Sequence, residues 1–184
     1  MKKTIISIGI ILVVIVIYGF GAYNSLVRAN EGITGQWAQV ETQYQRRFDL
    51  IPNLVESVKG IMKQEQAVFT AIADARTRYS GAQTIDAKAK AAGEVESALG
   101  RLLVITENYP QLKSSENVTT LMSQLEGTEN RITVERKRFN DLVQTYNVKV
   151  KTLPSSIIAS LTGFSEHSYF DAVEGSQNAP SVKF

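Results

Sequence analysis

The residues that could do chemistry in this chain are few and far apart. His167 is the only histidine, cysteine is absent and no Glu-x-x-His pair occurs, so the usual ligands of a transition-metal or di-metal carboxylate centre are missing. Glu126 and Glu129 are spaced i, i+3 but lie among several arginines, which favours ion pairs on a helix surface. We therefore predict a loop histidine, no metal site and no cofactor.

Motifs for hydrolysis or phosphate binding are also missing. The sequence has no nucleophile elbow, no His-Glu-x-x-His zinc motif and no glycine-rich phosphate loop, and a catalytic triad would have to use His167 as its base. The Arg46-Arg47 pair could contact lipid headgroups or an acidic partner. A solvated helix face or ion pairs with Glu41 or Asp49 are the simpler interpretation. We predict that the protein is not an enzyme and has no small-molecule substrate.

The charge balance argues against a nucleic-acid partner. The 184 residues include 20 lysines and arginines and 18 aspartates and glutamates, which gives a net charge of +2. The two signs are interspersed and no basic block occurs. With no cysteine there is no disulfide, and four prolines leave long stretches free to form helix.

The N-terminal stretch 4–27 contains no charged side chain. At ~1.5 Å per helical residue it reaches about 36 Å, which exceeds the ~30 Å thickness of a bilayer core. The alternative is a cleaved secretion signal, with Lys2 and Lys3 as its charged region and a small-residue cleavage site at 19–22. We predict an uncleaved anchor in the lipid bilayer, whose apolar side chains include Ile5, Ile8, Ile11, Val14 and Ile17.

The charges around this segment predict its orientation. Lys2 and Lys3 precede it, whereas Arg28 after it is offset by Glu31. By the positive-inside rule the N-terminus lies in the cytoplasm and the rest of the chain on the extracytoplasmic, periplasmic side. We therefore expect a single-pass protein of the bacterial cell (inner) membrane.

The same helix is predicted to continue beyond the membrane. No proline interrupts before Pro52, where the chain could either kink or reverse, and Asp49 is a candidate N-cap for a following helix. One apolar stripe with spacings of three and four, or their sums, predicts a long helix that enters a soluble bundle. Its members are Leu26, Ile33, Trp37, Val40, Tyr44 and Ile51.

Apolar spacing and breaking residues predict the later elements. Gly163 suits the left-handed cap of the last helix, with Phe164 folding back on it, and 175–180 has the composition of a flexible tail. No stretch alternates with period two, so the fold class is all-α: an N-terminal transmembrane helix continuous with an elongated antiparallel bundle of three to four long helices. After the first helix, we expect one helix near 52–79, a second from about Thr84 that Pro110 stops with Tyr109 extended, and two more near 114–153 and 154–162.

We divide the chain into a transmembrane anchor at 1–27, a helical-bundle domain at 28–153, and a short amphipathic helix with a flexible C-terminal tail at 154–184. The apolar end of the chain, from Ile157 to Phe170, packs on the bundle base or contacts a neighbouring subunit or the membrane surface. Four asparagines beside the apolar stripes are either exposed or buried and hydrogen-bonded across helices: Asn53, Asn130, Asn140 and Asn147. The predicted bundle core, whose members are also candidate oligomer contacts, contains Trp37, Tyr44, Phe48, Leu54, Leu125, Ile132, Phe139 and Tyr146.

Several phrases along the chain, in order, resemble the LemA family. They are YNSLV at 23–27, WAQVE at 37–41, QRRFDLIPNLV at 45–55, ENYPQLK at 107–113, LEGTENRI at 125–132, and the pairs Phe139-Asn140 and Tyr146-Asn147. The resemblance covers about 20–170 and implies one N-terminal membrane helix followed by an elongated antiparallel bundle. It implies no enzyme activity and no established functional residue, and the opposite topology has been proposed for some members.

The resemblance also implies a role in the cell envelope. Members resemble a magnetosome protein implicated in membrane-vesicle formation, and others are encoded beside HtpX-like metallopeptidases or TPM-domain membrane proteins. Our first hypothesis is a homo-oligomeric scaffold that organises or shapes the membrane. The alternative is an adaptor that binds another envelope membrane protein, such as an HtpX-like metallopeptidase.

Overall fold

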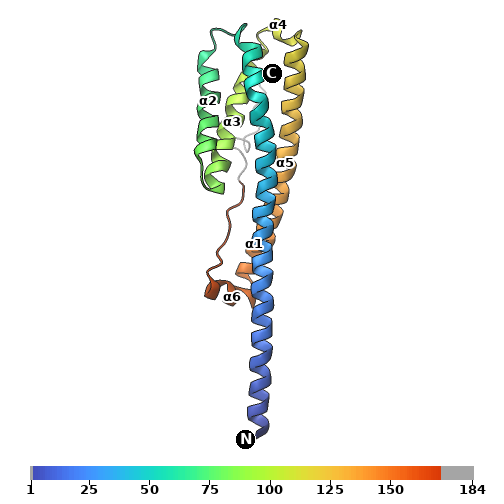
Figure 1. The fold of residues 1–184 in the computed structure, drawn as a ribbon, viewed down its shortest axis with the longest axis vertical. Coiled ribbons are helices and arrows are strands. Elements are labelled where there is room, and N and C mark those ends of the chain that lie inside the picture. The colour runs from blue at the N-terminus through green and yellow to red at the C-terminus, as the bar shows by residue number, and fades with distance from the viewer. Residues whose placement is uncertain (1, 171–184) are drawn as a thin grey trace, which may run out of the picture. The chain divides into compact units, whose positions relative to one another are not determined.

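The computed structural model of the protein describes residues 2–170, with only the backbone at Lys113. Every regular element in that range is a helix, which confirms the all-α prediction (Figure 1). The predicted tail at 175–180 lies outside the described residues. The helices are α1 (Lys2–Lys59), α2 (Gln66–Gly81), α3 (Ile85–Thr106), α4 (Pro110–Lys113), α5 (Glu116–Lys151) and α6 (Ser155–Thr162).

The described chain divides into two compact units. The first combines residues up to 38 with 137–169, and so contains the N-terminal part of α1, the end of α5, and α6. The second combines 39–136 with Phe170, and contains the rest of α1 and α5 together with α2, α3 and α4. Each unit is therefore built from segments that are far apart in the sequence.

Helix α1 continues through Pro52, so the helix start that the sequence predicted there is wrong. A proline inside a helix costs about 3 kcal/mol, because one hydrogen bond is lost and the ring crowds the preceding turn. The side chains of Phe48, Ile51 and Leu54 are all buried on the face around it. Burying large apolar side chains stabilises the helix by about 1.5–3 kcal/mol each, which offsets that cost.

The chain leaves α1 at a turn that the sequence did not predict. Residues 60–65 separate α1 from α2 and interrupt the helix expected at 52–79. Gly60 lies directly after the last residue of α1, and Met62 closes the turn with its N–H on the Val58 carbonyl (2.9 Å) and a fully buried side chain. Asp49 lies within α1 and caps no helix.

Helices α2 and α3 pack side by side in the second unit (Figure 1). As predicted, α3 begins after Thr84, whose Oγ1 accepts a hydrogen bond from the Ala87 N–H (3.1 Å). It ends at Thr106, earlier than expected. Pro110 does not simply stop this helix, because it also occupies the first turn of the short α4, where its missing N–H costs nothing.

Helices α5 and α6 lie close to their expected bounds. Gly163 has a left-handed backbone (φ 81°), and the Phe164 N–H donates to the Ala159 carbonyl (3.0 Å), as the sequence predicted for the end of α6. Gly127 is exposed within α5, and a β-carbon there would meet no atom within 4 Å. Close packing therefore does not require this glycine.

The eight side chains that the sequence assigned to the core are buried within their own chain. The packing is aromatic in both units: Trp37 and Phe139 meet edge to face in the first (5.6 Å between centroids), and Phe48 and Tyr79 do so in the second (4.6 Å). A contact with a second copy must therefore use other residues. The first unit holds Trp37, Phe139 and Tyr146; the second holds Tyr44, Phe48, Leu54, Leu125 and Ile132.

These two glycines predict stability changes of opposite sign. Gly163→Ala should lower the free energy of unfolding by about 1 kcal/mol, because an alanine side chain clashes in the left-handed region. Gly127→Ala should raise it by about 0.5–1 kcal/mol, because alanine loses less backbone entropy than glycine in an open helical position. Urea denaturation of the full chain in mild detergent, followed by circular dichroism, measures both. A stabilising Gly163→Ala would contradict the capping role.

Candidate functional site

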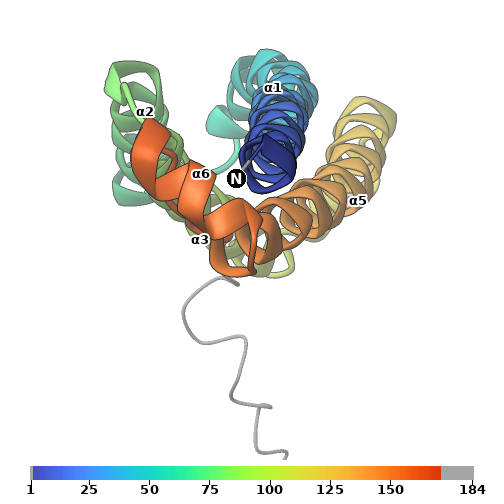
Figure 2. The same cartoon turned by 90° about the horizontal axis from the view of Figure 1, so that it is seen from below.

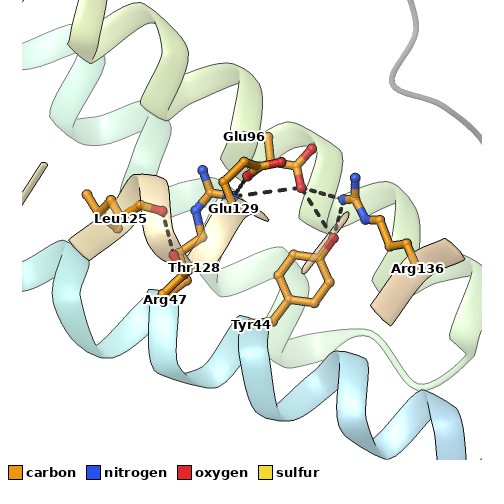
Figure 3. A network of polar contacts seen from close by, with 7 residues as sticks. All are labelled: Tyr44, Arg47, Glu96, Leu125, Thr128, Glu129 and Arg136. Atoms are coloured by element: carbon orange, nitrogen blue, oxygen red, sulfur yellow. Dashed lines mark hydrogen bonds and ion pairs between the residues drawn. The ribbon is translucent and has the colours of Figure 1, made fainter. Parts of the chain in front are cut away.

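A cluster of charged and polar side chains crosses the second unit. We call Tyr44, Arg47, Glu96, Glu129 and Arg136 the charged cluster. Tyr44 and Arg47 come from α1, Glu96 from α3, and Glu129 and Arg136 from α5, so the cluster joins three helices (Figure 3). The helices that carry it are also those that carry the apolar core of this unit.

Glu96 lies at the centre of this cluster. Its Oε1 accepts hydrogen bonds from Arg136 Nη2 and from the Tyr44 hydroxyl (3.3 Å), and Arg47 Nη1 lies 3.8 Å away. Arg136 also donates to the Tyr44 hydroxyl, and Arg47 forms a hydrogen-bonded ion pair with Glu129. One carboxylate thus holds groups from two other helices, with two arginines and two glutamates balancing in charge.

Burial sets the protonation of the cluster. It raises the pKa of the Tyr44 hydroxyl well above its usual range, and the Glu96 carboxylate adds to the rise. Burial also raises the pKa of Glu96, although the guanidinium groups of Arg136 and Arg47 oppose it. Burial alone would lower the pKa of Arg136, but Tyr44 and Glu96 more than offset that effect and the pKa is raised.

These pKa shifts decide what the cluster can do. Tyr44 stays a phenol and Arg136 stays charged near neutral pH, so neither is a base or a nucleophile there. Glu96 titrates above its usual range, and its Oε1 is engaged by Tyr44 and Arg136. The arrangement therefore fits a clamp on three helices better than a reacting centre. Its ion pairs favour one register of packing, and the Nε atoms of Arg47 and Arg136 are buried without a hydrogen-bond partner.

A second polar contact fixes the segment after α6 in the first unit. The buried Asn147 side chain pairs with the main chain of His167: its Nδ2 donates to the His167 carbonyl (2.9 Å) and its Oδ1 accepts from the His167 N–H (2.9 Å). The imidazole Nε2 lies 2.7 Å from Asn30 Oδ1, and the ring packs on Tyr146 (4.9 Å between centroids). His167 is thus a loop histidine. Asn147 is buried and hydrogen-bonded, which is one of the two alternatives that the sequence left open for it.

The five anchor residues, Ile5, Ile8, Ile11, Val14 and Ile17, are exposed on α1. Of the helices in residues 2–170, α1 is the one long and apolar enough to cross a membrane, by length and composition. Within that same range, no three His, Asp or Glu side chains gather in a way that could hold a metal ion. The exposed apolar segment is therefore the clearest functional feature outside the cores.

Sequence reasoning missed Glu96, the centre of the charged cluster. Its helix position was the available signal, because it lies four residues after the buried Ala92 and beside the buried Val95. The sequence also placed Glu126 and Glu129 together, but only Glu129 joins the cluster. Arg47 is buried, and its partners are Glu96 and Glu129, neither of which the sequence proposed for it.

The fold and the exposed apolar segment define a class of protein: an all-α protein associated with membranes. Comparison with known sequences is more specific, since the sequence pattern described as "LemA family" matches residues 36–184. The chain belongs to the LemA family. The resemblance seen in the sequence is thereby confirmed.

The chain is also similar to individual curated proteins. It is 29% identical to magnetosome protein MamQ of Magnetospirillum gryphiswaldense, over 80% of this chain and 64% of the relative. It is 27% identical to magnetosome protein MamQ 1 of Paramagnetospirillum magneticum, with the same shares covered. Protein LemA of Metamycoplasma hominis is 23% identical over 92% of this chain and 76% of its own length. The chain thus spans slightly less than two thirds of the MamQ proteins that it matches.

Removing Arg136 should destabilise the protein in a pH-dependent way. Arg136→Leu leaves the Glu96 carboxylate buried with one fewer counter-charge, which costs about 3 kcal/mol at neutral pH. The folded-state pKa of Glu96 is already raised. The stability that protonated Glu96 contributes is therefore fully present below the ordinary glutamate pKa, and it is lost as the pH rises through the raised value. The variant raises that pKa further, so the loss should grow as the pH rises above the ordinary glutamate pKa.

Urea denaturation at several pH values measures this effect. Arg78→Leu is the matched control, because Arg78 and Glu94 form an ion pair with both side chains exposed. Its cost should stay below about 1 kcal/mol and show no growth with pH. Adding Glu96→Gln to Arg136→Leu should recover much of the loss, and a loss that is equally large at both ends of the pH range would contradict the assignment.

Asn147→Ala should release the segment that follows α6. The change leaves the N–H and carbonyl of His167 without their partner, which costs about 1–3 kcal/mol locally. Amide hydrogen exchange at His167 should then accelerate by roughly tenfold or more, while the α5 amides stay protected. Asn130→Ala is the control, since Asn130 is exposed on the same helix. Unchanged exchange at His167 would show that the paired hydrogen bonds do not hold the segment.

Proposed function

We propose that this protein is a non-enzymatic, membrane-anchored scaffold that self-associates through its helical bundle and organises or shapes the membrane. The observation that carries the proposal is that the charged cluster is used inside the second unit, between its helices. The charged cluster is engaged within its own unit, and its members hold helices together. The exposed apolar side chains are then the part of the protein that can contact lipid or other proteins.

The anchor supports a membrane location. Ile5 to Ile17 expose their side chains along α1, and the segment is long enough to cross a bilayer core. We propose a single pass through the bacterial inner membrane. Lys2 and Lys3 before the segment favour a cytoplasmic N-terminus, with the bundle on the periplasmic side.

One face of α3 is suited to contact with a second copy. Leu103 and the 66%-exposed Val104 form an apolar pair on the surface of the second unit. Ser97 and Gly100 on the same helix are small and exposed, and a β-carbon at Gly100 would meet no atom within 4 Å. Small side chains let another helix approach closely, and burial of the two apolar side chains would stabilise the contact.

The apolar side chains of Met62 and Val143 are fully buried in their own chain and are not available for this contact. The proposal therefore uses the surface of α3. The magnetosome relatives fit a role at a membrane-bounded structure, and we extend that role to this chain as part of the same proposal.

Placing a charge at Val104 should disrupt self-association. Val104→Lys puts an ammonium group where the second copy would pack, and a cation near the C-terminal end of α3 does not oppose its dipole. The average mass of the full-length protein, extracted with its surrounding lipid, should fall from an oligomer to a single copy. Gln124→Lys, an exposed change on α5, should leave the mass unchanged.

Three results would contradict the proposal or part of it. A wild-type protein that is already a single copy in native lipid would remove the scaffold. A single copy held beside a different membrane protein would favour the adaptor alternative, in which the bundle binds and regulates another envelope protein. An oligomer that survives Val104→Lys would move the contact away from α3.

A further inference from the structure

Helix α6 lies against the apolar part of α1 within the first unit. A β-carbon at Gly19 would sit 3.7 Å from Cδ1 of Ile158, so this side chain packs directly over the glycine. The Phe164 ring contacts the Tyr23 ring, with 5.9 Å between centroids, and Ala159 between them is buried. Both ribbon views place α6 beside α1 (Figures 1 and 2). The contact falls at residues 19–23 of α1.

That position matches one boundary of a membrane. The rise from Ile5 to Tyr23 is ~27 Å at ~1.5 Å per residue, close to the ~30 Å thickness of a bilayer core. Tyr18, Phe20 and Tyr23 are exposed there, and aromatic side chains gather where lipid tails meet headgroups. The first charged residue beyond them is Arg28. Helix α6 therefore packs on α1 at the level where the span ends.

The side of α6 that faces away from α1 is apolar. Ile157 and Leu161 are spaced by four within α6, which places them along one side, and Leu153 lies just before the helix. They are 76%, 54% and 78% exposed, although isoleucine and leucine of a soluble core are normally buried. The buried Ala159 and the packed Ile158 occupy the other side. An apolar stripe on a short surface helix beside a membrane span fits burial in lipid.

The charges around this stripe fit the same environment. Lys149 and Lys151 end α5 directly before Leu153, and their amino groups bond Ser25 Oγ (3.0 Å) and Glu166 Oε2 (2.7 Å). Long basic side chains at a membrane boundary keep their charged ends in the headgroup layer. The stripe is thus apolar on its own side and bordered by polar and charged groups, as expected of a helix that lies at a membrane surface.

We propose that α6 is an interfacial membrane helix, whose Leu153, Ile157 and Leu161 side chains enter the lipid at the boundary where α1 leaves the bilayer. The inference rests on the proposed membrane span of α1 and extends it, because it assigns lipid contact to a second element. The chain would then touch the membrane twice within the first unit, through α1 and through the segment after α5. Two contacts fix the rotation and depth of α1, which a single span leaves open.

Single-cysteine spin labelling can test this directly, since the chain has no native cysteine. Ile157→Cys and Leu161→Cys carry a nitroxide in the full-length protein, reconstituted in phosphatidylethanolamine and phosphatidylglycerol vesicles. Accessibility to oxygen, which concentrates in lipid, is compared with accessibility to a water-soluble nickel chelate. Val14→Cys serves as the reference for the bilayer interior, and Gln144→Cys, exposed on α5, as the reference for water. Thr162→Cys, exposed on another side of α6, is the matched control.

The expected result is an oxygen-to-nickel ratio at positions 157 and 161 several-fold above that at 144 and below that at 14, with position 162 closer to water. A ratio equal to that at 144 would overturn the inference and leave the anchor intact. Spin–spin broadening between labels at 157, with low access to both reagents, would assign the stripe to a second copy and also overturn it. A water-like ratio at 14 would overturn the membrane span itself.

Discussion

The second unit depends on one partly buried carboxylate. Glu96 on α3 accepts from Arg136 and Tyr44 and lies beside Arg47, so groups from α1 and α5 converge on one oxygen atom. Apolar packing alone tolerates sliding of one helix along another, whereas ion pairs with fixed geometry do so only at the cost of an unpaired buried charge. The cluster therefore selects how the three helices align, and the aromatic side chains around Tyr44 and Phe48 fill the remaining space.

The sequence predicted what depends on local pattern, and failed where the tertiary environment decides. The helix start near Thr84 and the left-handed Gly163 after the last helix rest on local signals, and both predictions are confirmed. Pro52 was misread as a helix start, because a proline inside a helix and a proline at a turn look alike in sequence. Glu96 was missed because its role depends on arginines that reach it from two other helices.

In the first unit, hydrogen bonds hold the segment that follows α6. Asn147 holds the main chain of His167, and the same chain segment carries Phe164 onto Tyr23 of α1. The end of the described chain is thus tied to the helix that enters the membrane, and in our proposal α6 sits at the level where that helix leaves the lipid. In our proposal, the internal polar groups of this LemA-family protein specify its packing, and its exposed apolar surfaces contact lipid and a second copy.

The number of copies in native membrane is the most direct test of the proposed scaffold. The full-length protein would be extracted with its surrounding lipid, without detergent exchange, and imaged by single-particle electron microscopy. We predict a homo-oligomer whose anchors converge in one lipid patch. Isolated single copies, each with its own lipid and no neighbour, would contradict the scaffold and leave a monomeric membrane protein whose exposed α3 surface serves another partner.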